Sequence, residues 1–241
     1  MEALLPATCG RPNQIPRRFV WLMAMGLAGC SPGGSPPPPA PLPVVDLVVV
    51  QKKAEAGDAA AEALLGKCYA EGQGTQPDYL LAVKWYRAAV AQGNAEAEAG
   101  LGELYEAGQG MAKDMAEAAR LYRASADKGC AVGQYNLAFL YEQGRFFKVD
   151  QVEATKWYRL AAEGGNAIAQ YDLGQRYDLG VGVPVDKVEA LFWLEVAAAN
   201  GQVDAATRLK AVRDKLSRAE REEALRRLKA FKPRGGGSFL F

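Results

Sequence analysis

The sequence predicts an all-α protein, a right-handed α-solenoid built from antiparallel helix-turn-helix repeats. The first observation is a repeated phrase: KWYRAAVAQGN begins at Lys84 and returns as KWYRLAAEGGN at Lys156. The second is a block of 36 residues that occurs four times between residues 57 and 200, with no insertion or deletion. The third is that the blocks carry signals for the start and end of two helices. A fixed period of this size indicates stacked units rather than one globular core.

Several columns keep their residue type in all four blocks, which span 57–92, 93–128, 129–164 and 165–200. A small residue is followed by a tyrosine, a glycine, an acidic residue, an alanine and then a bulky pair that is usually Trp-Tyr. Six columns held in phase through four blocks predict that these residues build the scaffold. The tyrosine column is Tyr69, Tyr105, Tyr141 and Tyr177, and the acidic column is Asp78, Asp114, Asp150 and Asp186.

Each block is expected to form one helical hairpin. Asp58, Asn94 and Asn166 follow the leading glycine of their blocks and can cap a first helix. A glycine turn ends that helix, because glycine tolerates positive φ, and the acidic residue after the turn can cap a second helix. A hairpin of this kind cannot bury its apolar face alone, so it must stack on its neighbours.

The column pattern resembles the Sel-one-like repeat, a relative of the tetratricopeptide repeat. The resemblance covers residues 57–200, and the fourth block, with LGQRYDLGVG from Leu173, matches it most completely. The third block departs from it, because Phe146 stands where a loop glycine belongs and Ala138 replaces the small glycine. We therefore expect a different turn in that loop, with exposed aromatic surface.

The N-terminal residues predict export rather than fold. Three arginines precede the apolar run FVWLMAMGLAG, which is too short for a permanent membrane helix but fits a signal peptide over 1–29. Its ending, LAGC, resembles a bacterial lipobox, which implies lipidation of Cys30 and anchoring in the outer membrane, facing the periplasm. Residues 30–43 are rich in proline and predict an extended tether. The alternative is a buried N-terminal helix with a core cysteine.

The two ends of the repeat array are expected to be caps, since terminal units of solenoids are atypical. Residues 44–56 predict an N-terminal capping helix started by Asp46. Residues 201–234 predict a half repeat followed by a capping helix that begins with a capping box at Ser217 and carries Leu225, Leu228 and Phe231 on one face. Residues 235–241 are expected to be a flexible tail.

The composition offers little for catalysis. The 241 residues include no histidine, and no serine or threonine lies in a nucleophile motif, so we expect no catalytic residue, no metal site and no cofactor. A net charge of +1 excludes the overall basic character typical of nucleic-acid binding. Cys68 and Cys130 lie nearly two repeats apart, too far to bond to each other, and both are expected to be buried.

The related tetratricopeptide fold implies where a partner would bind, because its inner groove is lined by variable positions of the first helices. In the third and fourth blocks these positions form an aromatic, apolar centre with an acidic rim, which is typical of a protein or peptide hot spot. The alternative is that Tyr135 and Phe139 pack against the neighbouring repeat. A second candidate surface is Phe146 with Phe147. The predicted groove residues are Val132, Tyr135, Phe139, Glu142, Ile168, Tyr171, Gln175 and Asp178.

These features predict a scaffold or adaptor without enzymatic activity. It would be anchored in the bacterial envelope by its lipid and would bind protein or peptide partners in the groove. The competing class is an envelope enzyme or inhibitor that acts on cell wall or β-lactam-like ligands.

Overall fold

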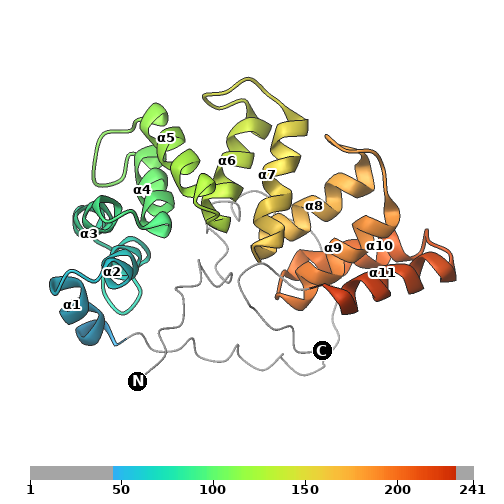
Figure 1. Ribbon diagram of the computed structural model, residues 1–241, viewed down its shortest axis with the longest axis horizontal. Helices are drawn as coiled ribbons and strands as arrows, with labels where there is room; N and C mark the ends of the chain where they lie inside the picture. Colours follow the sequence, from blue (N-terminus) through green and yellow to red (C-terminus); the bar gives the residue numbers. More distant parts are fainter. Residues whose placement is uncertain (1–45, 232–241) are drawn as a thin grey trace, which may run out of the picture.

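The computed structural model describes residues 46–231, which form eleven α-helices and no strand (Figure 1). The all-α prediction is therefore confirmed. The predicted signal peptide (1–29), the tether (30–43) and the tail (235–241) lie outside the described residues. In chain order the helices are α1 (Leu47–Glu55), α2 (Ala59–Glu71), α3 (Tyr79–Ala91), α4 (Ala95–Ala107), α5 (Met115–Asp127), α6 (Ala131–Gln143), α7 (Gln151–Glu163), α8 (Ala167–Leu179), α9 (Lys187–Ala199), α10 (Val203–Arg213) and α11 (Arg218–Ala230).

Four hairpins, α2–α3, α4–α5, α6–α7 and α8–α9, stack into an arc that runs from α1 to the α10–α11 end (Figure 1). α2 contacts α4, α4 contacts α6, and α8 contacts α10. The second helices of successive hairpins do not approach one another as closely within residues 46–231. At three of the four junctions the stack is therefore tighter along the first helices, which fits a position on the inner side of the arc, whereas α6 and α8 approach each other less closely. An α-solenoid is the architecture that the repeat predicted.

Side chains cap the helices as the sequence predicted. Asp58, Asn94 and Asn166 each accept a hydrogen bond from a backbone N–H in the first turn of α2, α4 and α8. The acidic column does the same for the second helices α3, α5, α7 and α9. The first helices end at a glycine with φ between 67° and 75°, a conformation that glycine adopts without strain.

The small residue at the tenth position of each block sets the distance between the two helices of a hairpin. A methyl group on Gly102 would lie 2.7 Å from the Tyr122 ring, and one on Gly66 would lie equally close to the Tyr86 ring. The side chain of the second helix therefore fills the space that a side chain on the first helix would occupy. This close approach explains why the column stays small.

A second recurring contact joins each hairpin to the next. Arg87 donates a hydrogen bond to the Tyr105 hydroxyl over 3.2 Å, and Arg123 donates to the Tyr141 hydroxyl over 2.6 Å. Arg159 and Tyr177 form the same pair. At the last junction Glu195 and Arg213 occupy the equivalent positions and form an ion pair. The tyrosines of this column therefore help to join each hairpin to the one before it.

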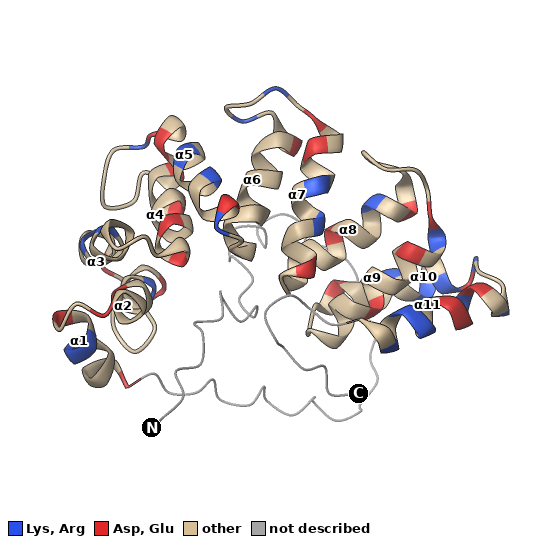
Figure 2. Ribbon diagram, viewed as in Figure 1, with Lys and Arg blue, Asp and Glu red and all other residues tan. Residues whose placement is uncertain are grey.

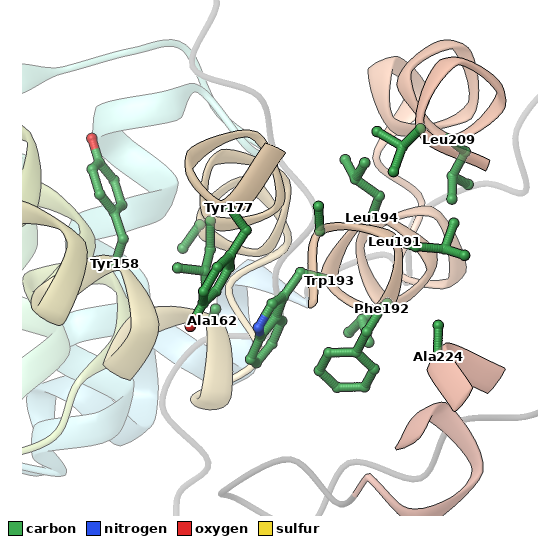
Figure 3. Close-up of a cluster of buried hydrophobic side chains, with 14 of the residues drawn as sticks. Tyr158, Ala162, Tyr177, Leu191, Phe192, Trp193, Leu194, Leu209 and Ala224 are labelled. Atoms are coloured by element: carbon green, nitrogen blue, oxygen red, sulfur yellow. The ribbon is translucent and has the colours of Figure 1, made fainter. Parts of the chain in front are cut away.

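The C-terminal cap does not extend the series of hairpins, because α10 and α11 both pack on α9. Figure 3 shows Leu209 of α10 on the side of α9 that carries Leu191 and Leu194, and Ala224 of α11 on the side that carries Phe192. Ser217 and Glu220 form the predicted capping box of α11. The predicted apolar face of α11 was partly wrong: Leu228 is buried, but Leu225 is 45% exposed and Ala224 takes the place expected for it.

The loop after α6 keeps the turn of the other repeats, so the expected change of turn was wrong. Phe146 has a φ of 72°, and the glycines at the equivalent positions, Gly74, Gly110 and Gly182, have φ of 68° to 72°. The turn therefore has the same backbone conformation whether glycine or phenylalanine occupies this position. The expected exposed aromatic surface is present, because Phe146 is 57% exposed.

Replacing Phe146 with glycine is predicted to raise the free energy of unfolding by about 1 kcal/mol, because a non-glycine residue at positive φ is strained. Chemical denaturation of the full chain measures the change. Phe146→Ala serves as the control, because it removes the ring and keeps the strained φ. Equal stability of the two variants would contradict the prediction.

Candidate functional site

The predicted groove residues line the first helices of the third and fourth hairpins. Four lie at spacings of three or four along α6, and four lie at the same spacings along α8, so each set occupies one helix face. Seven of the eight side chains are partly buried, and Asp178 is buried. The structure therefore places the set on the concave side, although most members also touch neighbouring side chains.

Tyr135 and Phe139, the two aromatic residues of α6 in this set, both have packing partners. The Tyr135 ring meets the Tyr158 ring edge-on at 5.6 Å between centroids. The guanidinium of Arg145 lies over the Phe139 ring, 5.6 Å from its centroid. Since both rings are only partly buried, they combine a structural contact with exposed surface.

The acidic members of the set connect neighbouring repeats. Glu142 of α6 forms an ion pair with Arg176 of α8, and Asp178 of α8 forms one with Arg208 of α10 at 2.8 Å. Asp178 is also bound by Lys187. Before them in the chain, Glu106 and Arg145 make the equivalent connection at 2.9 Å. An acidic rim was predicted for the groove, and these acids are in ion pairs that join the repeats.

Arg176 is a cation inside the scaffold. Its side chain is 4% exposed, and the same column in the first three repeats holds Cys68, Leu104 and Leu140, all buried. Arg176 donates to Thr155 Oγ1 over 3.0 Å and to Gln151 Oε1 over 3.1 Å, in addition to its pair with Glu142. A buried guanidinium needs this many partners, because its desolvation is otherwise too costly.

The partners of Arg176 also depart from the repeat. Thr155 stands where the other repeats have Val83, Ala119 and Leu191, and Gln151 stands where the first two have Tyr79 and Met115. Glu142 in turn accepts a hydrogen bond from the Tyr158 hydroxyl over 2.9 Å. Arg176 lies over the Tyr158 ring, 4.6 Å from its centroid. At this junction a connected polar network therefore includes the Arg176 and Thr155 columns, which hold apolar side chains in the other repeats.

Asp172, one turn before Arg176 on α8, borders this network. Burial, together with the negative charge of nearby Glu142, raises the pKa of its carboxyl to about 7, although the positive charge of Arg176 acts in the opposite direction. Because this value exceeds the ordinary aspartate pKa of 3.8, the protonated form favours folding, and that stability is lost as the pH rises through about 7. Burial likewise raises the pKa of the Tyr135 and Tyr158 hydroxyls, which keeps both neutral.

Tyr171 opens onto a recess between α8 and α10. Asp204, Thr207, Arg208 and Ala211 of α10 line the recess. The Arg208 Nε atom is buried without a hydrogen-bond partner in the described part of the chain. Tyr171 is the predicted site residue that lines this recess, and Ile168 and Gln175 lie on the same helix face.

The second candidate surface divides into an exposed and a packed residue. Phe147 stacks on Tyr141 with 4.6 Å between ring centroids, so it belongs to the junction between the repeats. Phe146 meets Phe147 edge-on at 5.0 Å and keeps most of its ring exposed. Only Phe146 offers free surface there.

The first helices carry most of the negative charge. α2, α4, α6 and α8 together hold nine acidic and two basic residues, a net charge of −7. The second helices α3, α5, α7 and α9 hold six acidic and seven basic residues. Figure 2 shows basic and acidic positions side by side on α10 and α11 at the far end of the arc. The first helices are therefore acidic in composition, α4 most of all, although Glu62, Glu98 and Asp178 among these residues are buried.

No group of His, Cys, Asp and Glu side chains within residues 46–231 is arranged to hold a metal ion. No helix of this region has the length and apolar character needed to cross a bilayer. Cys68 and Cys130 are both buried, and the predicted lipidation residue Cys30 lies outside the described residues.

Four consecutive segments match the Sel1 repeat family: 59–94, 95–130, 131–166 and 167–202. These segments cover more than half of the chain, and this protein belongs to the Sel1 repeat family. Repeats of this family generally mediate protein–protein interactions, and its members are typically non-catalytic scaffolds. Comparison with curated proteins yields no significant match.

Among solved structures, a Sel1 repeat protein from Oxalobacter formigenes is 34% identical, with a TM-score of 0.59 over 69% of this chain and 48% of that chain. A sel1 repeat protein from Klebsiella pneumoniae is 26% identical, with a TM-score of 0.48 over 69% of this chain and 83% of that one. A protective antigen of uropathogenic Escherichia coli with an SLR fold is 27% identical, with a TM-score of 0.49 over 77% and 48%. This chain spans about half the length of the Oxalobacter protein.

The sequence-based selection missed the polar junction. Asp172, Arg176, Thr155 and Gln151 were not among the predicted site residues, because the selection followed the variable positions of a related fold. A signal was available: Arg176 is a charged residue in a column that is otherwise apolar. Comparing the scaffold columns with one another would have identified it.

Removing the buried cation is predicted to destabilise the protein. Arg176→Ala should lower the free energy of unfolding by about 2–4 kcal/mol, because it leaves Glu142 without its counter-charge and opens a cavity among buried polar groups. A double-mutant cycle with Glu142→Gln should give a coupling energy of about 1–2 kcal/mol.

The matched control is Arg120→Ala, which breaks an exposed ion pair with Glu117. It should change stability by less than about 0.5 kcal/mol. An effect of Arg176→Ala no larger than that of Arg120→Ala would contradict a structural role for the network.

Proposed function

We propose that this protein is a lipid-anchored adaptor of the bacterial envelope that binds a protein segment along the concave side of its repeats. The observation that carries the proposal is the asymmetry between the two rows of helices. The first helices are acidic and carry partly exposed aromatic rings, while the second helices are close to neutral. A partner that follows the first helices would therefore meet negative charge that is densest on α4 and aromatic rings on α6 and α8.

The rigidity of the stack supports recognition without a covalent step. Each junction is held by an Arg–Tyr or Glu–Arg pair, and the three later junctions are also held by an ion pair. A surface that is already ordered loses little conformational entropy when it binds, which favours affinity. The aromatic centre on α6 and α8 would supply the anchor, because buried aromatic contacts dominate most interfaces.

The envelope location rests on the N-terminal sequence. Three features support an exported chain with a lipid anchor: the short apolar run, the LAGC ending and the proline-rich stretch after Cys30. In a two-membrane bacterium, a serine after the lipidated cysteine would direct the chain to the outer membrane. The adaptor would then hold its partner in the periplasm, near the inner surface of that membrane.

Site-specific photo-crosslinking tests where a partner binds. The full chain is expressed in a two-membrane bacterium with p-benzoylphenylalanine at position 171 on α8, or at position 156 on the exposed side of α7 in a matched sample. A defined protein adduct is expected from Tyr171→p-benzoylphenylalanine and none from Lys156→p-benzoylphenylalanine. Adducts from both positions, or from position 156 alone, would overturn binding on the concave side.

The same assay separates packing from recognition at the aromatic centre. Tyr135→Ser combined with Phe139→Ser should keep the helical circular dichroism and lose the adduct from position 171. If this variant instead fails to fold, the two rings are scaffold. Tyr171→Ser with an unnatural crosslinker at Gln175 then measures the contribution of the recess.

The lipid anchor has a separate test. Cells that express the full chain should incorporate labelled palmitate into the protein, and Cys30→Ala should abolish the label because it removes the acceptor sulfur. Cys68→Ala is the matched control, since Cys68 is a buried free thiol and should have no effect on labelling. Undiminished labelling of Cys30→Ala would exclude this anchor.

A further inference from the structure

Asp172 is a carboxyl that the scaffold leaves without a partner. No donor within residues 46–231 makes a hydrogen bond or an ion pair with it. Arg176, a cation that acts on Asp172, is bound instead to Glu142, Thr155 and Gln151. Asp172 keeps part of its surface exposed on α8. The group is therefore desolvated enough to bind strongly and open enough to be reached.

The preceding repeat shows what this position does when it is structural. Asn136 occupies the same column in the third block, and it donates a hydrogen bond to Glu103 of the second block over 3.0 Å. For Asp172 the residue equivalent to Glu103 is Phe139, which offers no hydrogen bond. Both members of the inter-repeat pair have changed, so Asp172 is released from the junction.

The surroundings of Asp172 combine negative charge with aromatic rings. On α6, Glu142 adds a second carboxylate and Tyr135 lies close enough for Asp172 to raise its pKa. Tyr158 on α7 adds a second aromatic ring, which meets the Tyr135 ring edge-on. On α10, Asp204 and Arg208 act on the adjacent Tyr171. With Arg176 paired to Glu142, an ionised Asp172 gives the cluster one uncompensated negative charge.

We propose that Asp172 and Tyr135 receive an arginine side chain of the partner segment. This inference rests on the proposed adaptor function and names the chemistry that the partner must supply. A guanidinium can bind a carboxylate in a bidentate manner and can pack on a tyrosine ring, so it suits both groups better than an ammonium does. The net charge of −7 on the first helices would attract a basic segment to the same side.

Arginine binding should weaken as the pH falls, because it requires the ionised form of the Asp172 carboxyl. Asp172 must be ionised to attract a cation, and its pKa is about 7 in the unliganded protein. The ionised fraction falls about tenfold between pH 8 and pH 6 for a group with this pKa. Arginine binding should therefore weaken about tenfold over that range, while a bound cation would lower the pKa.

Carbon-13 NMR of the purified full chain tests the assignment, with the side-chain carboxyl resonance of Asp172 as the reporter. The probe is N-acetyl-arginine N-methylamide, and the neutral isostere N-acetyl-citrulline N-methylamide is its control. A saturable shift of the Asp172 resonance is expected with the arginine probe at pH 8, about tenfold weaker binding at pH 6, and no shift with the citrulline probe.

Variants complete the test. Asp172→Asn should abolish arginine binding while its amide spectrum remains that of a folded protein, and Asp127→Asn, on the exposed end of α5, should bind like the wild type. Unchanged binding by Asp172→Asn, equal binding of both probes, or no saturable shift at pH 8 would overturn the inference.

The crosslinking experiment keeps this result separate from the proposed function. An adduct from position 171 that persists without arginine binding at Asp172 would remove the arginine assignment and leave the adaptor. Arginine binding without any adduct from position 171 would keep the arginine assignment and count against the adaptor.

Discussion

The close approach of two helices within each hairpin is the constraint on which the rest of the structure depends. It requires a glycine or alanine on the first helix, because the side chain of Tyr86, Tyr122, Tyr158 or Leu194 fills the adjacent space. Only when the hairpin closes in this way do its two outer faces match those of the next hairpin. The Arg–Tyr pairs and ion pairs between repeats then fix the stack, and the first helices form one concave, acidic row.

The junction between the third and fourth repeats shows how such a scaffold can acquire a distinct site. Arg176 replaces an apolar residue, and Glu142, Thr155 and Gln151 supply the partners that its burial demands. Because these groups bind the Arg176 guanidinium, Arg176 makes no ion pair with Asp172. Asp172 is left with its carboxyl desolvated and unpaired by the described residues, although it sits in a column where Asn136 is structural. Polar groups required for packing and polar groups available for binding are therefore neighbours on one helix.

Much of the fold could be predicted, because caps and periodic columns are local signals. The helix-starting residues and the positive-φ glycines fall where the sequence placed them. The predicted site was less complete. Glu142 and Asp178 were expected at the rim of a groove, and they form ion pairs with Arg176 and Arg208 from the next elements. Residues that are far apart in the chain make these pairs, so a comparison within single blocks could not reveal them.

The sequence by itself determined the repeat length, the two helices of each repeat and the family, because each of these follows from spacing and from capping within about 36 residues. Only the tertiary structure decided the conformation of Phe146, the fold-back of α11 onto α9 and the isolation of Asp172. For α11 and for Asp172, the deciding feature is what a neighbouring element places beside the residue. The backbone of the loop follows the packing of its repeat, and a charge is free or paired according to what the next repeat places beside it.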